Sequence, residues 1–397
     1  MKNAVSIVRC GSYDEADVLK GLQRAINLIG GIEIFVRPGN RVLLKPNLLY
    51  GKSPEKAVTT HPSIMKGMVA IVREAGGIPF IGDSPSVESL NKAAEKSGIK
   101  KIAEDAGCPL VKFDEPVLVE GRGRVFKKWE IDRSVLEADV IINLPKWKTH
   151  SQVLLTLGVK NLFGCVPGSK KALWHLKAGD DRKRFAQMLI DLYCVIPSSL
   201  TVLDGILGME GNGPGSGHPI SLGLILASRD PLYLDQIVCD ILGISRKAVP
   251  TNRVAFESGL GRDSIEVVGE PLDRVRIFDF TFPTLTEPDW NLPAFVKRAL
   301  KNALTSKPAV EQELCKACHR CEEICPAKAL TTEDERCVFD YKKCIRCFCC
   351  LEVCPEGAIS IQPGWLLKLV NRKRMMAGRK GQKRKAQGTK LSTNNND

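Results

Sequence analysis

No apolar stretch of this 397-residue sequence approaches the roughly 18 residues that a helix needs to cross a bilayer. The first residues, Met1 to Arg9, lack the charged region, apolar core and small-residue cleavage site of a secretory signal. Seven of the 15 cysteines are scattered without the spacing of a disulfide framework, which is typical of a reducing compartment. We therefore expect a cytoplasmic protein without a transmembrane segment.

The glycine-rich segments lack both common nucleotide-binding patterns. The segment Gly208 to Gly217 contains no G-x-x-x-x-G-K-[ST] and precedes an expected strand, whereas a phosphate-binding loop opens a helix. The segment Gly158 to Gly168 lacks the Rossmann pattern, so nothing favours a nicotinamide cofactor. We interpret Gly208 to Gly217 as a lid, with Glu210 at its base as a substrate-binding candidate.

What the sequence does contain is one cysteine pattern written twice. The spacing C-x2-C-x2-C-x3-C-P occurs two times between residues 315 and 355, and it is the spacing of bacterial two-cluster ferredoxins. Three thiolates two residues apart bind one cube, whereas the fourth reaches the other cube. The pattern therefore predicts two 4Fe-4S clusters, one bound by Cys315, Cys318, Cys321 and Cys354 and one by Cys344, Cys347, Cys350 and Cys325.

Structural zinc is the alternative for these cysteines. Zinc sites use paired C-x2-C units and need neither the third cysteine nor the Cys-Pro ending. Cys337 and Cys349 fall outside the repeat, and we expect them to be bystanders near the clusters. Residues 311–364 resemble a bacterial two-cluster ferredoxin domain. The resemblance implies an α+β module of two short hairpins and two short helices that transfers low-potential electrons.

The chain of 397 residues is too long for one ordinary core, which predicts two or three domains. Apolar β-rich runs alternate with helical patterns over residues 1–290, which predicts an α/β domain with a mostly parallel sheet and flanking helices. We expect a connector helix within 291–310, the ferredoxin-like domain at 311–364 and a basic tail at 365–397. Strands are expected at 5–8, 42–44, 79–81, 140–144, 200–203 and 223–227, and helices at 13–28, 61–75, 90–97 and 232–242.

Short motifs in residues 40–245 resemble the domain of unknown function 362 family. They are Lys45-Pro46-Asn47, Gly82-Asp83-Ser84, Asn143-Leu144-Pro145-Lys146, Lys148-Thr149-His150, Gly158-Val159-Lys160-Asn161 and Asp204-Gly205. The resemblance implies an α/β domain that is often followed by a ferredoxin module. It implies no settled activity.

Polar side chains follow several expected strands. Ligands of open parallel sheets bind beyond the carboxyl ends of the strands, so we expect these side chains to meet at one rim. In extended chain Lys146, Lys148 and His150 alternate onto one face, and clustered lysines lower one another's pKa. The catalytic candidates are Lys146, Lys148, His150, Asp83 and Asp204, and the substrate-binding candidates are Lys45, Asn47, Lys160 and Glu210. The alternative is a set of solvated loop lysines and a structural histidine.

These features predict a ferredoxin-coupled oxidoreductase that passes single electrons between the clusters and an anionic substrate or cofactor at the rim. The alternative is a non-catalytic electron-transfer or maturation partner that docks another protein through the α/β domain. Either function requires a redox partner protein. The net charge is +13, and residues 368–397 supply +9 of it, so the tail is a candidate contact for an acidic protein, an anionic lipid or nucleic acid.

Overall fold

The structure is a computed structural model that describes residues 3–85, 88–283, 303 and 305–365. Residues 291–302 and 304 of the expected connector lie outside these residues, and so does the basic tail beyond Trp365. The end of the expected connector is not helical, because Lys307–Val310 form a strand that pairs within the C-terminal module. Within the described ranges, no helix is long and apolar enough to cross a membrane.

The first domain is built on a mixed sheet with the strand order β12-β1-β11-β10-β7-β2-β3-β4. Neighbouring strands from β10 to β4 run parallel, and β11 is antiparallel to β1 and β10. The strand bounds are β1 (Ala4–Arg9), β2 (Arg41–Pro46), β3 (Ile78–Asp83), β4 (Leu110–Lys112), β7 (Val140–Leu144), β10 (Ser198–Glu210), β11 (His218–Ser228) and β12 (Glu266–Gly269). A short extension of β8 (Lys146–His150) and β9 (Leu154–Thr156) pairs with β10, and β5 (Pro116–Glu120) and β6 (Lys128–Asp132) form a separate hairpin.

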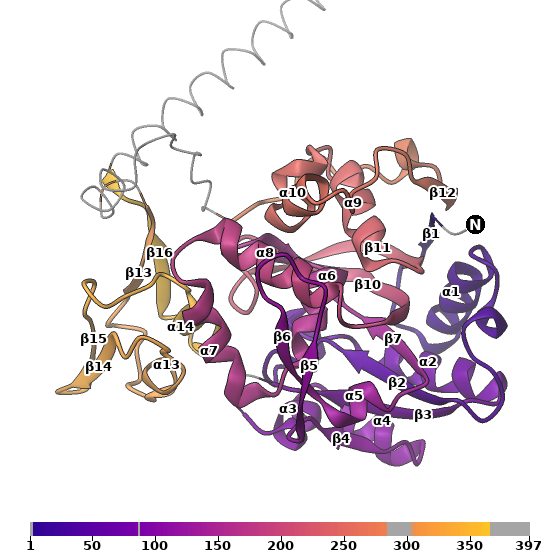
Figure 1. Cartoon of the computed structure of the whole chain (residues 1–397), viewed down its shortest axis with the longest axis horizontal. Coiled ribbons are helices and arrows are strands. Elements are labelled where there is room, and N and C mark those ends of the chain that lie inside the picture. The colour runs from indigo at the N-terminus through magenta and orange to yellow at the C-terminus, as the bar shows by residue number, and fades with distance from the viewer. Residues whose placement is uncertain (1–2, 86–87, 284–302, 304, 366–397) are drawn as a thin grey trace, which may run out of the picture.

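Helices cover both faces of the sheet, as the predicted α/β class requires (Figure 1). One face carries α1 (Glu15–Asn27), α2 (Pro62–Glu74), α3 (Leu90–Lys96) and α4 (Ile99–Asp105). The other carries α5 (Arg133–Leu136), α6 (Gly158–Asn161), α7 (Gly168–Ala178), α8 (Arg182–Tyr193), α9 (Pro231–Ile241) and α10 (Pro250–Glu257). Successive strand residues alternate between the faces, so Leu44 packs in the first core and Leu43 in the second.

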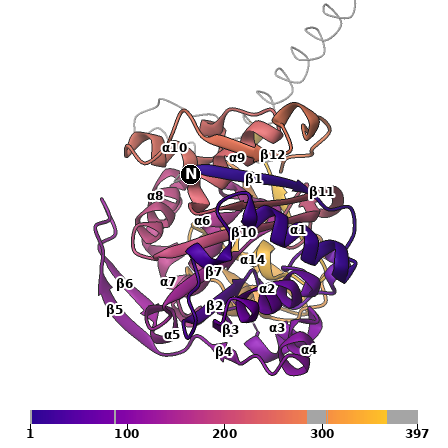
Figure 2. The ribbon, with the colours of Figure 1, turned by 90° about the vertical axis from the view of Figure 1, so that its right-hand side faces the viewer.

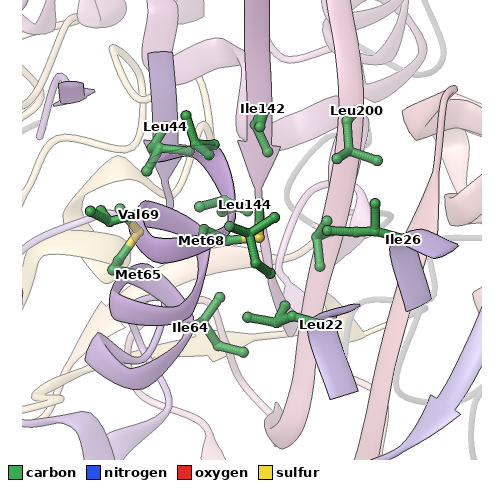
Figure 3. Packing of buried hydrophobic residues seen from close by; sticks show 14 of the residues in the cluster. Leu22, Ile26, Leu44, Ile64, Met65, Met68, Val69, Ile142, Leu144 and Leu200 are labelled. Carbon is green, nitrogen blue, oxygen red and sulfur yellow. The ribbon is translucent and has the colours of Figure 1, made fainter. Parts of the chain in front are cut away.

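The helix beginnings follow from local sequence. The Asp14 side chain accepts hydrogen bonds from two free backbone N–H groups at the start of α1, and Pro62 occupies the first position of α2. Apolar residues at helical spacing then face the sheet. Leu22 of α1 and Met68 of α2 meet Ile142 and other strand residues in the first core (Figure 3).

The six predicted strands and four predicted helices are present, but one boundary was wrong. β10 continues to Glu210, so Gly208 and Glu210 belong to a strand and the glycine-rich turn spans 211–217. The glycine at position 208 is explained by packing, because a β-carbon there would lie 2.5 Å from Leu222 Cδ1. The prediction of a loop from residue 208 was therefore wrong, since this glycine leaves room for a neighbouring side chain within the sheet.

The C-terminal module has the predicted α+β form. A β14 (Leu330–Glu333) and β15 (Arg336–Phe339) hairpin is accompanied by a second antiparallel pair, β13 (Lys307–Val310) and β16 (Ile359–Gln362). Two short helices complete it, α13 (Arg320–Glu323) and α14 (Cys349–Val353). The second pair joins the first and last strands of the module, so it closes the module instead of forming a hairpin.

The module rests against the α/β domain through α14. In Figure 1 it lies beside α7, and Figure 2 shows α14 behind the strands of the sheet. Lys52 Nζ donates to Pro355 O at 2.8 Å, and His150 Nε2 lies 3.2 Å from Glu352 Oε1. Both contacts come from segments that follow strands or extend them, so the cysteine-rich module lies over the carboxyl edge of the sheet.

Candidate functional site

A small polar cavity lies between the carboxyl edge of the sheet and α14. Its free volume is about 60 Å³. A cavity needs about 10–15 Å³ on this measure for one water molecule, so the space suits a ligand of a few non-hydrogen atoms. Its charged and polar lining comprises Lys45, Asn47, Asp83, Ser84, Lys148, His150, Thr156, Lys160, Asn161, Lys171, His175 and Glu352.

One wall of the cavity is a buried ion pair at the ends of β2 and β3. Lys45 Nζ lies 3.0 Å from Asp83 Oδ1 and donates to Pro46 O at 2.8 Å. Asp83 also accepts from the backbone N–H groups of Leu48 and Ser84, each at 2.8 Å. Gly164 makes room for the pair, because a β-carbon there would lie 2.3 Å from Lys45 Nζ. The parallel register of β2 and β3 places both side chains at one edge.

A chain of asparagine amides forms the floor. Asn47 Nδ2 donates to Asn161 Oδ1 at 2.7 Å, and Asn161 Nδ2 donates to Asn143 Oδ1 at 2.8 Å. Asn143 Nδ2 then donates to Gly158 O at 3.0 Å. Each amide orientation is fixed by the next, and Asn47 Oδ1 is left without a hydrogen-bond partner among the described residues.

Two lysines project between these walls. Lys148 Nζ donates to Val58 O at 2.7 Å. Burial, and then repulsion from the Lys160 ammonium, lowers the pKa of Lys148 to about 7. Lys160 has no hydrogen bond or ion pair to any residue that the structure describes, and its ammonium lies 5.0 Å from the Phe163 ring centroid. Burial lowers the pKa of Lys160 as well.

His150 connects the sheet edge to the cysteine-rich module. Its Nδ1 accepts from the backbone N–H groups of Gln152 and Val153, so the proton of the neutral ring is on Nε2 and faces Glu352. Burial lowers the pKa of His150, and the nearby Glu352 carboxylate partly offsets this effect. Burial acts to raise the pKa of Glu352, but His150 and Lys160 outweigh it and lower the pKa to about 2. Glu352 is therefore an anion in the cavity wall.

Helix α7 contributes two groups that the sequence reasoning missed. Lys171 Nζ donates to Ser84 O, and burial lowers the pKa of Lys171 to about 8. His175 stacks on Phe185 at 4.7 Å between ring centroids, and burial lowers its pKa to about 3. Lys171 and His175 are four residues apart on one helix, and this i, i+4 spacing was the available signal. Glu352, between two cysteines of the repeat, gave no such signal.

The chemistry of the cavity follows from its charges. Four lysines face two carboxylates, Asp83 and Glu352, and each carboxylate is already close to a cation or an N–H group. When all four lysines are protonated, the cavity has an excess positive charge in a site with little water. Such a site binds an anion, and the two lysines whose pKa values fall to about 7 and 8 exchange protons near neutral pH.

Of the six residues predicted to surround one cavity, Lys45, Asp83, Lys148 and His150 line it, and Lys146 and Asp204 do not. The substrate-binding candidates Asn47 and Lys160 line it as well. Lys146 and Asp204 are register partners on β8 and β10, so the carboxylate captures the ammonium at 2.8 Å. Tyr13 donates to Asp204 at 2.6 Å and accepts from Lys146 at 2.7 Å, and the His61 N–H donates to Asp204 at 2.9 Å. We call these four residues the closed cluster.

Glu210 also lies outside the cavity lining. Its Oε2 accepts from the Thr281 N–H at 2.7 Å at the far end of β10. The turn that follows does reach the cavity, because Pro214 lines it. Gly215 fits beneath the module, since a β-carbon there would lie 2.4 Å from Tyr50 Oη and 3.0 Å from Glu352 O. The turn therefore helps to seat α14.

The repeated cysteines surround two further cavities in the predicted groups. Cys315, Cys318, Cys321 and Cys354 line one, and Cys325, Cys344, Cys347 and Cys350 line the other. The surroundings of these cysteines also suit iron–sulfur clusters, whose sulfur ligands accept hydrogen bonds from the backbone. The Ala329 and Ala358 N–H groups donate to Cys325 Sγ and Cys354 Sγ, each at 3.2 Å.

The two cysteines outside the repeat also lie at these cavities. Cys337 and Cys349 are buried beside the two cavities, and Cys337 Sγ lies 3.7 Å from Cys321 Sγ. Their predicted bystander role stays a prediction.

Comparison with known proteins gives two family matches. A model described as "Domain of unknown function (DUF362)" matches residues 42–240, and one for a 4Fe-4S binding domain matches residues 308–331. A thylakoid-associated protein of Synechocystis sp. is 38% identical over 306 residues, which is 76% of this chain and 95% of that protein.

Among solved structures, the lactate racemase apoprotein from Thermoanaerobacterium thermosaccharolyticum aligns with a TM-score of 0.37 and 14% identity. The alignment covers 58% of this chain and 54% of the racemase, so the chain matches about half of that protein's length. A likeness this weak supports no statement about fold or activity.

Proposed function

We propose that this chain, which belongs to the family of the domain of unknown function DUF362, passes single electrons between two 4Fe-4S clusters and a small anion in the cavity between its domains. The observation that carries the proposal is the position of Glu352. It lines the cavity, and it lies two residues from both Cys350 and Cys354. One short helix thus joins the cavity to a cysteine of each predicted cluster.

The clusters supply one-electron chemistry at low potential when they are bound. The chain's own residues would do the rest. Lys148 and Lys160 hold the anion, and Asp83 keeps Lys45 in place. Lys148 gives up a proton near neutral pH because its pKa is about 7, so it balances the charge of each electron that the anion gains. Lys171 is the second group in the wall that exchanges protons near neutral pH, because its pKa is about 8, and His150 Nε2 faces Glu352.

Electrons reach the site from a redox partner protein. The two cysteine groups differ in exposure, since Cys318 is exposed whereas Cys344, Cys347 and Cys350 are buried. In our proposal the partner contacts the face around Cys318, and the buried group lies on the side of the cavity. The relative's name describes association with thylakoids, and the tail's charge suits a peripheral contact with anionic lipid. We propose a cytoplasmic protein that makes such a contact.

The test uses full-length protein purified without oxygen. We expect about eight irons and eight acid-labile sulfides per chain, and mass spectrometry of the released small molecules should identify an anion. That anion should reoxidise dithionite-reduced clusters in the wild type. It should not do so in Lys148→Met with unchanged iron, and the exposed Lys101→Met is the matched control.

The outcomes separate the alternatives. Iron bound at about four per chain, or zinc in its place, would contradict the two-cluster assignment. Clusters that stay reduced with every copurified anion would instead favour the non-catalytic electron-transfer or maturation partner.

A further inference from the structure

Asn47 Oδ1 is a buried acceptor in the cavity wall, and no residue that the structure describes donates a hydrogen bond to it. We propose that the ligand carries an O–H or N–H group that donates to Asn47 Oδ1, so the natural ligand is a small hydroxylated or protonated oxyanion. This inference rests on the anion cavity of the proposed function and narrows its ligand class.

The orientation of Asn47 is set by its surroundings. Its Nδ2 donates to Asn161 Oδ1 at 2.7 Å, and turning the amide over would bring two carbonyl oxygens together. Asn161 cannot turn to compensate, because its own Nδ2 donates to Asn143. The backbone is held as well, since the Asn47 N–H donates to Thr60 Oγ1 at 2.8 Å. The oxygen of Asn47 is therefore a fixed acceptor.

That oxygen is buried and unpaired. Asn47 is 8% exposed, and Oδ1 finds no hydrogen-bond donor in the part of the chain that the structure describes. Buried polar groups are nearly always paired, so an orphaned acceptor in a cavity wall marks where a ligand donates. The lysines in the wall do not fill this role, because the hydrogen bonds of Lys45, Lys148 and Lys171 go to other groups and none reaches Asn47 Oδ1.

The same cavity also contains a cation, Lys160, in addition to the acceptor Asn47 Oδ1. Lys160 has aromatic rings as its neighbours and no polar partner among the described residues. His175 is 5% exposed, and its Nδ1 is also unpaired. The cavity thus combines a free cation with a fixed acceptor, and a volume of about 60 Å³ limits the ligand to a few non-hydrogen atoms.

These features predict discrimination between anions of the same charge. A ligand without a donor leaves Asn47 Oδ1 buried and unpaired, which costs about tenfold or more in affinity. Glycolate and acetate differ by one hydroxyl group, and hydrogenphosphate and sulfate are tetrahedral dianions of which only hydrogenphosphate carries an O–H. In each pair the first member should bind more tightly by that factor.

The experiment is calorimetric titration of the full-length, cluster-loaded protein with these four anions. Asn47→Ala should bring both affinity ratios close to one while acetate affinity is retained. Asn161→Ala, which frees the Asn47 amide to turn, should lower the ratios too. The exposed Asn91→Ala on α3 is the matched control, and the cluster absorption spectrum checks that each variant is folded.

Each result has a distinct meaning. Equal binding of glycolate and acetate by the wild type would overturn this inference, even if neither asparagine variant folds, and would leave the anion cavity standing. Unchanged ratios in a folded Asn47→Ala variant would overturn it as well. No binding of any of the four anions would contradict the proposed function itself.

Discussion

The α/β domain buries two lysine–aspartate pairs, and they differ in what surrounds them. In the closed cluster, Lys146 and Asp204 are both fully buried and share Tyr13 as a third partner. In the cavity, Lys45 and Asp83 lie 3.0 Å apart, compared with 2.8 Å for Lys146 and Asp204, but the cavity also contains Asn47 Oδ1 and His175 Nδ1, which have no partner among the described residues. A buried charge with all its partners stabilises a fold or specifies it. A buried polar group without a partner in the wall of a cavity is where a ligand can bind.

Breaking the closed cluster should have the largest effect on stability. Asp204→Ala leaves the Lys146 ammonium buried without its carboxylate, so we expect a loss of about 3–5 kcal/mol in the free energy of unfolding. Denaturant titration of the full-length protein under anaerobic conditions measures it. Lys160→Met is the comparison, and it should cost less than about 1 kcal/mol because it removes no ion pair or hydrogen bond among the described residues. Equal losses of unfolding free energy in Asp204→Ala and Lys160→Met would contradict the distinction between the closed cluster and the cavity.

In anion binding we expect the reverse order, with a larger loss of affinity in Lys160→Met than in Asp204→Ala. Lys160→Met removes the unpartnered cation, and a hydrogen bond to a charged group contributes about 1.5–3 kcal/mol, so affinity for glycolate should fall by about ten- to a hundredfold. The iron content should not change. Calorimetric titration measures the loss, with Lys101→Met as the control. Undiminished affinity in Lys160→Met would remove this lysine from the site.

As the pH rises, the affinity for an anion should fall, whereas the contribution of Lys148 to the free energy of unfolding should rise. Lys148 titrates at about 7 in the folded protein and at about 10.4 when unfolded, so between these values the unfolded chain binds more protons. This group therefore contributes a stability that rises with pH across that window. Affinity for a carboxylate should instead fall as pH rises through about 7 and 8, where Lys148 and Lys171 lose their charge.

Titrations with glycolate from pH 6 to 9 check the affinity, and Lys148→Met should show a shallower dependence. An affinity that does not change over this range would mean that neither lysine titrates there.

The smallest effect on both regions should come from removing the tail. Deleting residues 368–397 removes a charge of +9, so retention on a polyanion column should be lost. The cluster spectrum, glycolate affinity and unfolding free energy should all stay as they are. Equal retention of the truncated protein would place the basic surface elsewhere in the chain.

Much of this site was predictable because the rule for parallel sheets is local. Each of Lys45 and Asp83 follows an apolar run that reads as a strand, and the carboxyl ends of parallel strands share an edge. Lys146 is an exception to this rule. It lies two residues before Lys148 in the same strand, but its register partner on β10 is Asp204, which holds it in the closed cluster.

The sequence by itself determined the grouping of the cysteines, the alternation of strands and helices and the strand-end lysines, because spacing and periodicity act over a few residues. The tertiary structure decided which of those lysines keep partners, which helix supplies Lys171 and His175, and that Glu352 faces His150 from another domain. These facts depend on contacts between segments up to about 300 residues apart. Such contacts are set by packing the whole chain, and no local pattern encodes them.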